Sequence, residues 1–376
     1  MGQSDMNSIK KWFTKRAAQI VPGLAIICAF VLLQTVSVPV LSPALDRIGL
    51  LVFDSFQRIS PRPYQDAAVR VVDIDDETIR RFGQWPWPRT DIARLTLAVG
   101  DAGAASIAFD IVFSESDRTS PHQLAKRFQK SDPGIARTLN ALPDNDAQLA
   151  QVFGATPAVT GYFLTNDDQG QVVTPKAGLA LSGTLPTSAP RYRSAVMPLP
   201  ALEAAGAGSG FLSIKADEDS VIRRAPLIAV QGDQLLPSLS LDALRVARQA
   251  SSVIVKTSDG SGEAGQSGDV VSLKIADFEV PTTAAGEMWM HYTKPVPERV
   301  VPAWKILSGA LQPEEMQRLF GGHIVFIGAG AIGLRDLRST PLNDSEPGVM
   351  VHAQATEQMV LEHFLVRPDW AVGLER

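Results

Sequence analysis

The sequence has few residues able to form disulfides or bind metals. It contains a single cysteine, Cys28, among 376 residues. One cysteine cannot form a disulfide within the chain, and it cannot supply a cysteine zinc cluster or a Cys-x-x-Cys redox pair. The five histidines also lack the spacing of metal motifs: they are His122, His291, His323, His352 and His363. We therefore expect a fold stabilised by packing, with no resident metal and no cofactor, and we expect His352 to be an ordinary buried histidine.

Excess positive charge is also absent. The chain has 35 lysines and arginines against 40 aspartates and glutamates, which gives a net charge of −5. Domains that bind nucleic acid usually carry a basic face, so nucleic acid is an unsuitable partner. The composition is 45% hydrophobic and 20% charged, which excludes a disordered chain and leaves room for one large domain or two ordinary ones.

Charged residues are missing altogether from residues 17–45. Residues 20–41 read IVPGLAIICAFVLLQTVSVPVL, and a helix of this length crosses about 30 Å of hydrocarbon at about 1.5 Å per residue. We therefore predict a transmembrane helix over residues 17–44. A cleaved signal peptide would have a shorter apolar core and a small-x-small site, and a buried core helix fits poorly with prolines near both ends.

The charges that flank this stretch predict its orientation. Four basic residues precede it: Lys10, Lys11, Lys15 and Arg16. The positive-inside rule then leaves residues 1–16 in the cytoplasm and exports the rest of the chain. In a bacterium, this is a protein anchored once in the inner membrane with a periplasmic body.

Downstream, strand patterns alternate with helix patterns. Residues 69–74 and 106–113 are β-branched, apolar runs typical of buried strands, and residues 89–99 between them have helical spacing. Further strands are expected at 158–164, 211–214, 225–230, 253–256, 270–275, 288–292 and 323–327, and further helices at 146–153, 237–248 and 349–364. The pattern predicts an α/β fold whose mixed β-sheet is flanked by helices.

Three segments interrupt this alternation. Residues 114–145 are polar and contain several prolines, so we expect a surface insertion with one short helix near residues 123–128. The Gly/Ser/Asp tract TSDGSGEAGQSGD is bracketed by two strands and predicts a long hairpin tip. The final helix, 349–364, shows amphipathic spacing. No linker divides residues 60–366, which indicates one exported domain.

A literal GxGxxG, residues 328–333, follows the last predicted strand. In a dinucleotide-binding fold such glycines hold a pyrophosphate, but they must open a helix and precede a second strand with an acidic end. Here the following segment is charged and contains two prolines. We expect a strand-to-loop turn that uses glycine for positive φ, and no dinucleotide.

Two groups of residues invite a ligand site. Carboxylates follow both of the first two strands, at Asp73, Asp75 and Asp110 among others, and Trp85-Pro86-Trp87-Pro88-Arg89 precedes a helix. Carboxylates at strand ends suit a hard cation or a polar ligand, and two fixed tryptophans can wall a pocket. Asp75 or Asp76 could equally cap a helix over residues 78–82, and the tryptophans could plug the sheet edge.

Residues 71–117, VVDIDDETIRRFGQWPWPRTDIARLTLAVGDAGAASIAFDIVFSESD, resemble the signature of the CHASE2 family. Five further blocks are similar to family segments: DSFQR at 54–58, D-x-x-L-A at 146–150, DEDSVIRRAP at 217–226, P-S-L at 237–239 and the closing block at 325–353. The resemblance runs from about residue 45 to residue 370. Ser220 departs from it, because the family usually has glycine at this turn position.

The resemblance implies an extracytoplasmic sensor domain, residues 45–370, of a bacterial signalling receptor. In this family the sensor is followed by membrane helices and a cytoplasmic effector such as a nucleotide cyclase, a kinase or a diguanylate cyclase. This chain then corresponds to a receptor's front part, with residues 371–376 leading toward a second membrane region. It is expected not to be an enzyme itself.

Other classes remain open. One alternative is an exported metal-dependent hydrolase that uses Asp73 and Asp110, and another is a structural dimerisation module without a ligand. The resemblance also implies a homodimer. The anchor helix and residues 45–59 are the expected interface, because Leu50, Phe53 and Phe56 lie at helical spacing.

If a small-molecule or protein ligand binds, we expect it near Asp75, Trp85, Trp87, Arg89 and Asp110, because ligands gather where strands of open α/β sheets end. A buried Asp110 would need a partner, and Arg89 is the arginine within the motif. We therefore predict an Arg89–Asp110 pair, with no catalytic residue assigned.

Overall fold

The computed structural model describes residues 42–168, 170–262, 265–331 and 337–366. The chain divides into two compact units, residues 1–56 with 366–376 and residues 57–365. Helix α2 (Ser42–Ile59) begins in the first unit. In the described ranges, no helix is both long and apolar enough for a membrane span. The predicted span, 17–44, lies outside the described residues except for its last three, which begin α2.

A mixed sheet forms the centre of unit 57–365, in the order β15-β1-β16-β2-β3-β6, with β7 also paired to β3. Its strands are β1 (Val69–Asp73), β2 (Ser106–Phe109), β3 (Ala158–Thr165), β6 (Ser194–Val196), β7 (Gly208–Phe211), β15 (Val300–Pro302) and β16 (Ile324–Gly328). All pairs are parallel except β3 with β6. The predicted mixed α/β class is therefore confirmed, although β2 ends four residues before the predicted strand end.

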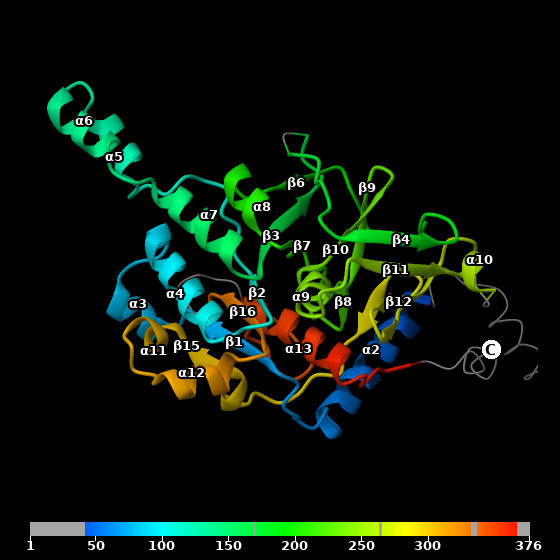
Figure 1. The fold of residues 1–376 in the computed structure, drawn as a ribbon. Helices are drawn as coiled ribbons and strands as arrows, with labels where there is room; N and C mark the ends of the chain where they lie inside the picture. The colour runs from blue at the N-terminus through cyan, green and yellow to red at the C-terminus, as the bar shows by residue number, and fades with distance from the viewer. Residues whose placement is uncertain (1–41, 169, 263–264, 332–336, 367–376) are drawn as a thin grey trace, which may run out of the picture. The chain divides into compact units, whose positions relative to one another are not determined.

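Alternate residues of β1 point into different cores, as a pleated strand requires. Val71 belongs to the core beneath α9 (Leu239–Ala247) and α13 (Gly348–Val360), whereas Val72 belongs to the core on the opposite face. The helices of that opposite face are α3 (Asp76–Phe82), α4 (Arg89–Asp101), α7 (Asn145–Ala155), α8 (Pro200–Ala205), α11 (Ala303–Leu307) and α12 (Pro313–Phe320). Parallel strands need cover on both faces, and Figure 1 shows helices on each side of the sheet.

Helix α13 differs from its prediction. Residues 348–359 are all buried, so the expected amphipathic helix is wrong. The helix lies between the main sheet and smaller strands, packing against β1 and β16 and also against β8 (Arg224–Pro226) and β13 (Phe278–Pro281). Its polar side chains are consequently buried too. The predicted state of His352 is confirmed: it is buried, and burial lowers its pKa to about 4.

Smaller sheets cover the α9 and α13 side. One has the order β13-β12-β11-β4, with β4 (Gly178–Ser182), β11 (Ser252–Thr257) and β12 (Val270–Ile275). In a second sheet, β9 (Ile228–Gln231) lies between β10 (Gln234–Pro237) and β5 (Arg191–Tyr192). Two further pairs are β8 with β14 (Glu287–Trp289) and β17 (Leu337–Arg338) with β18 (Glu346–Pro347). Strands β11 and β12 are antiparallel, which confirms the predicted hairpin around the Gly/Ser/Asp tract. The tract also contains a short helix, α10 (Ser258–Ser261).

The polar insertion contains two helices where one was predicted. These are α5 (Pro121–Phe128) and α6 (Pro133–Asn140). The side chain of Asp132 accepts hydrogen bonds from the N–H groups of Gly134 and Ile135, at 2.9 and 3.0 Å, and so caps α6. The pair forms a helical hairpin that projects from the body (Figure 1).

Candidate functional site

The carboxyl ends of β1, β16 and β2 lie side by side at one edge of the main sheet. The N–H of Ile74 donates to the carbonyl of Gly328 at 2.9 Å, and the N–H of Asp110 donates to the carbonyl of Ile327 at 2.9 Å. The parallel register thus gathers Asp73, Asp75 and Asp110 after neighbouring strands, as predicted for a polar edge.

Asp73 holds the glycine loop at this edge. Its Oδ1 accepts the N–H of Gly330 at 2.8 Å. The pKa of Asp73 is raised to about 6, mainly by burial and also by the charges of Asp75 and Asp76, against the opposing hydrogen bond from Gly330. The carboxyl group is therefore close to half-protonated near pH 6.

The glycines are required here for space. A Cβ on Gly330 would lie 2.4 Å from Oδ1 of Asp73, and one on Gly328 would lie 2.6 Å from Cβ of Val349. Neither glycine has a positive φ, so the predicted reason for them was wrong. The close approach of a carboxylate and of α13 explains them instead. The remainder of GxGxxG, residues 332–333, lies outside the described residues.

Asp75 has a structural role. Its Oδ1 accepts the N–H of Thr78 at 2.7 Å and also the Thr78 hydroxyl, so it is the N-cap of α3. The capping interpretation of this carboxylate is confirmed.

The two tryptophans pack into the structure beside α3. Trp87 is 2% exposed, and its indole N–H donates to the carbonyl of Gly83 at 2.9 Å. Trp85 meets it edge-on, with ring centroids 5.6 Å apart, and Phe82 lies 6.2 Å from it. Trp87 therefore fills the core, while Trp85 covers it from a partly exposed position.

Arg89 pairs with a different carboxylate from the predicted one. Its Nε lies 3.3 Å from Oδ1 of Asp146, its Nη2 donates to the carbonyl of Glu115 at 2.9 Å, and its guanidinium stacks on Phe113. The predicted Arg89–Asp110 pair is wrong, because α4 packs against α7 and so places Arg89 beside the first turn of α7.

Asp117 completes a buried polar group around Arg89. One carboxylate oxygen accepts the backbone N–H of Arg89 and the side-chain amide of Asn145, each at 2.8 Å. The backbone N–H of Asp117 donates to Asp146 at 3.0 Å. We call Arg89, Asp117, Asn145 and Asp146 the stem socket, since the helical insertion leaves and re-enters the body between them. It joins two of the motif blocks that were recognised separately, residues 71–117 and 146–150.

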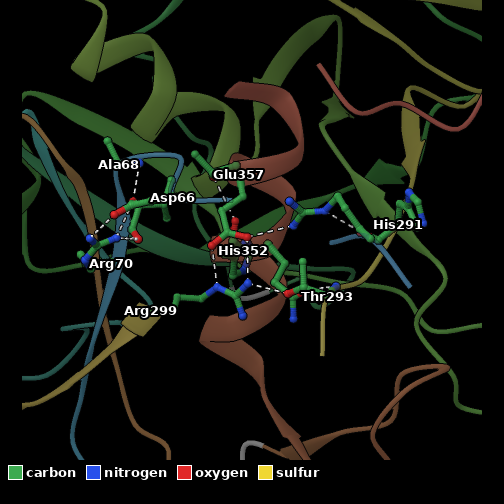
Figure 2. A network of polar contacts seen from close by, with 12 residues as sticks. Asp66, Ala68, Arg70, His291, Thr293, Arg299, His352 and Glu357 are labelled. Carbon is green, nitrogen blue, oxygen red and sulfur yellow. Dashed lines mark hydrogen bonds and ion pairs between the residues drawn. The ribbon is translucent and has the colours of Figure 1, made fainter. Parts of the chain in front are cut away.

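Sequence reasoning missed a fully buried charge network. Glu357 on α13 accepts hydrogen bonds from Arg62 (2.9 Å) and from Nε and Nη2 of Arg299 (2.5 and 2.9 Å). All three side chains are at most 1% exposed. Thr293 accepts from Nη2 of Arg299 at 2.5 Å, and Gln354 accepts the N–H of Thr293 at 2.8 Å. We call Arg62, Thr293, Arg299, Gln354 and Glu357 the arginine–glutamate network; Figure 2 shows Arg299 joined both to Glu357 and to Thr293.

This network connects three segments far apart in sequence. Arg62 lies just after α2. Its backbone N–H donates to the carbonyl of Tyr292 at 2.9 Å, and its Nε donates to the carbonyl of His291 at 2.9 Å. Glu357 lies 295 residues later, near the end of α13. No local pattern in the sequence pairs such residues; the only signal was that α13 contains polar residues on every side.

The described residues contain no group of three His, Cys, Asp or Glu side chains arranged to hold a metal ion. The carboxylates at the sheet edge are instead occupied with backbone N–H groups, as Asp73 and Asp75 show.

A family model described as the CHASE2 domain matches residues 25–374, nearly the whole chain. No curated protein and no solved structure matches it.

Proposed function

Because the chain belongs to the CHASE2 family of extracytoplasmic sensor domains, we propose that it is the sensor part of a bacterial transmembrane receptor. In this proposal residues 17–44 anchor it in the inner membrane and the body is periplasmic. It passes a change caused by a ligand or partner to a cytoplasmic effector, such as an adenylate cyclase, a kinase or a diguanylate cyclase, that follows in the receptor.

The arginine–glutamate network is the observation that carries this proposal. A receptor of this kind must couple the segment that follows its membrane anchor to the segment that leads toward the effector. Arg62 lies in the segment that follows α2, and Glu357 lies in α13, the last helix of unit 57–365. The two side chains form a buried ion pair. Removing one partner of such a pair costs about 3–5 kcal/mol, so the two segments are strongly coupled.

We place the ligand at the carboxyl edge of the main sheet, near Asp75 and Asp110. The neighbouring Asp73 holds a loop whose glycines tolerate no side chain, so a ligand there would act directly on α13 through Gly328 and Val349. Asp110→Asn is then expected to give a folded protein that no longer signals. Trp87→Ala should instead lower the melting temperature.

A topology assay tests the location. Alkaline phosphatase fused after residue 60 is expected to be active in cells, and β-galactosidase fused at the same position is expected to be inactive. The reverse pattern would refute the sensor proposal.

A signalling assay tests the coupling. In the complete receptor, Arg62→Gln weakens the shared ion pair and is expected to shift effector output away from the parent level. Arg318→Gln, at an exposed arginine on α12, is the matched control and should leave output unchanged. Equal output from both variants and the parent would contradict a role of the network in transmission.

A second copy of the chain is the partner we propose for α2. Its exposed apolar side chains are Ile48, Leu51, Val52, Phe56 and Ile59. Of the predicted contact residues, Phe56 is therefore exposed, whereas Leu50 and Phe53 are partly buried. Sedimentation in detergent should show a dimer that Phe56→Asp weakens. A monomer at every concentration would count against it.

A further inference from the structure

The helical insertion projects from the body on a rigid base. We call residues 118–143, which contain α5 and α6, the prong. Its two ends are held together, because the hydroxyl of Ser120 donates to Asp144 at 2.7 Å and accepts the N–H of Asn145 at 3.2 Å. Asp144 also caps α7 through the N–H of Ala147 at 3.0 Å. The stem socket lies directly below. The prong is therefore mounted on the body at both ends.

The prong is basic on a chain that is acidic. It contains Arg118, Lys126, Arg127, Lys130 and Arg137 against one carboxylate, Asp132. Its net charge is thus +4, which leaves −9 for the rest of a chain whose total is −5. All of these side chains except Arg118 lie on the two helices or the turn between them, where they are exposed.

Apolar side chains lie among these charges. Inside the hairpin, the small residues Ala125 and Ala136 are buried and allow α5 and α6 to approach closely. On the outside, Phe128, Ile135 and Leu142 are 39%, 45% and 47% exposed. Ile135 lies in the first turn of α6, and Leu142 lies two residues beyond the last residue of that helix. A charged surface that also presents exposed apolar side chains is typical of an interaction site.

Charge and exposed apolar side chains select the kind of partner. A second prong is unsuitable for a face-to-face contact, since both would carry +4. Exposed apolar groups fit a protein better than a purely polar polyanion.

We propose that the prong is a docking surface for a separate protein, through an acidic patch of that protein which also presents apolar side chains. The partner's carboxylates would face the lysines and arginines of α5, and its apolar side chains would cover Ile135 and Leu142. The stem socket keeps this surface in a fixed orientation, so that a partner bound there acts on the start of α4 through Arg89.

Binding of defined acidic polymers to the purified full chain in detergent tests this proposal. The probes are a fluorescein-labelled glutamate–tyrosine copolymer, polyglutamate of equal length, and vesicles of phosphatidylglycerol. The chain is expected to bind the copolymer more tightly than polyglutamate. Lys126→Glu, Arg127→Glu and Lys130→Glu together should weaken copolymer binding at least about tenfold. Ile135→Ser with Leu142→Ser should reduce copolymer affinity to that of polyglutamate.

A matched control reverses three exposed charges outside the prong: Lys274→Glu, Lys294→Glu and Arg318→Glu. It should retain copolymer binding, because it changes the net charge equally. Equal loss in control and prong variants would overturn the proposal, and so would binding of the vesicles through the prong without binding of the copolymer. Neither result depends on the topology of the chain, so a failure here is distinguishable from a failure of the sensor proposal.

Discussion

The carboxyl group of Asp73 should make the stability of the protein depend on pH in an unusual direction. Its pKa is raised from 3.8 to about 6 in the folded protein, chiefly by burial. Between these values the folded state binds more protons than the unfolded state, so stability falls as the pH rises from about 4 to about 7. This is the opposite of the effect of an ion-paired aspartate, which loses stability as pH falls.

The size of the effect follows from the shift. One pKa unit corresponds to about 1.36 kcal/mol, so a shift of about two units is worth at most about 3 kcal/mol above pH 7. Asp73 keeps partial contact with solvent, which reduces the expected value to about 2 kcal/mol. Asp73→Asn removes the titration and retains an oxygen that can accept the N–H of Gly330.

Urea unfolding at pH 5 and pH 8, followed by tryptophan fluorescence, measures this difference. Asp73→Asn should gain stability relative to the parent at pH 8, and much less at pH 5. Asp101→Asn, at an exposed position at the end of α4, is the control and should show the same small difference at both pH values. A difference for Asp73→Asn that is equal at both pH values, or larger at pH 5, would refute the reasoning.

Three other substitutions test the packing. Gly330→Ala should destabilise the protein by about 1–3 kcal/mol in urea unfolding because its Cβ would meet the Asp73 carboxylate, whereas Gly154→Ala in α7, with no atom within 4 Å, should be neutral or stabilising. Ser220 has a φ of +66°, so Ser220→Gly should raise the melting temperature and Ser220→Val should lower it; the opposite order would be inconsistent with the left-handed turn. Trp87→Ala should cost about 3–5 kcal/mol in the same unfolding assay, and a loss below about 1 kcal/mol would mean that Trp87 does not fill the core.

Local patterns predicted the elements of this fold more reliably than their partners. The strand at 69–74 and the helix at 89–99 were found because their apolar periodicity is a property of the segment itself. The helix expected at 237–248 is likewise present as α9, and the side chain of Ser238 caps it by accepting the N–H of Leu241. The departure of Ser220 from the family pattern marked a true left-handed residue.

Tertiary pairing was not readable in the same way. Arg89 and Asp110 lie within one motif block, which favoured a pair between them, but helix packing brought Arg89 to Asp146. Helix α6 was missed because its eight residues include a proline and a glycine, which are typical of a loop. Its Asp132 cap was the local signal that could have revealed it.

The arginine–glutamate network shows why the least predictable contacts matter most for a sensor. Desolvating Arg62, Arg299 and Glu357 offsets much of their mutual attraction, so the network adds less to stability than an apolar core of equal volume. The hydrogen bonds that Glu357 accepts, however, need one arrangement of the three segments. A rearrangement that broke one ion pair would leave a buried charge uncompensated and would cost several kcal/mol. A ligand can reverse such a preference only if its affinities for the two arrangements differ by a similar free energy. In the receptor proposed above, the network would therefore favour two distinct states over a continuous deformation.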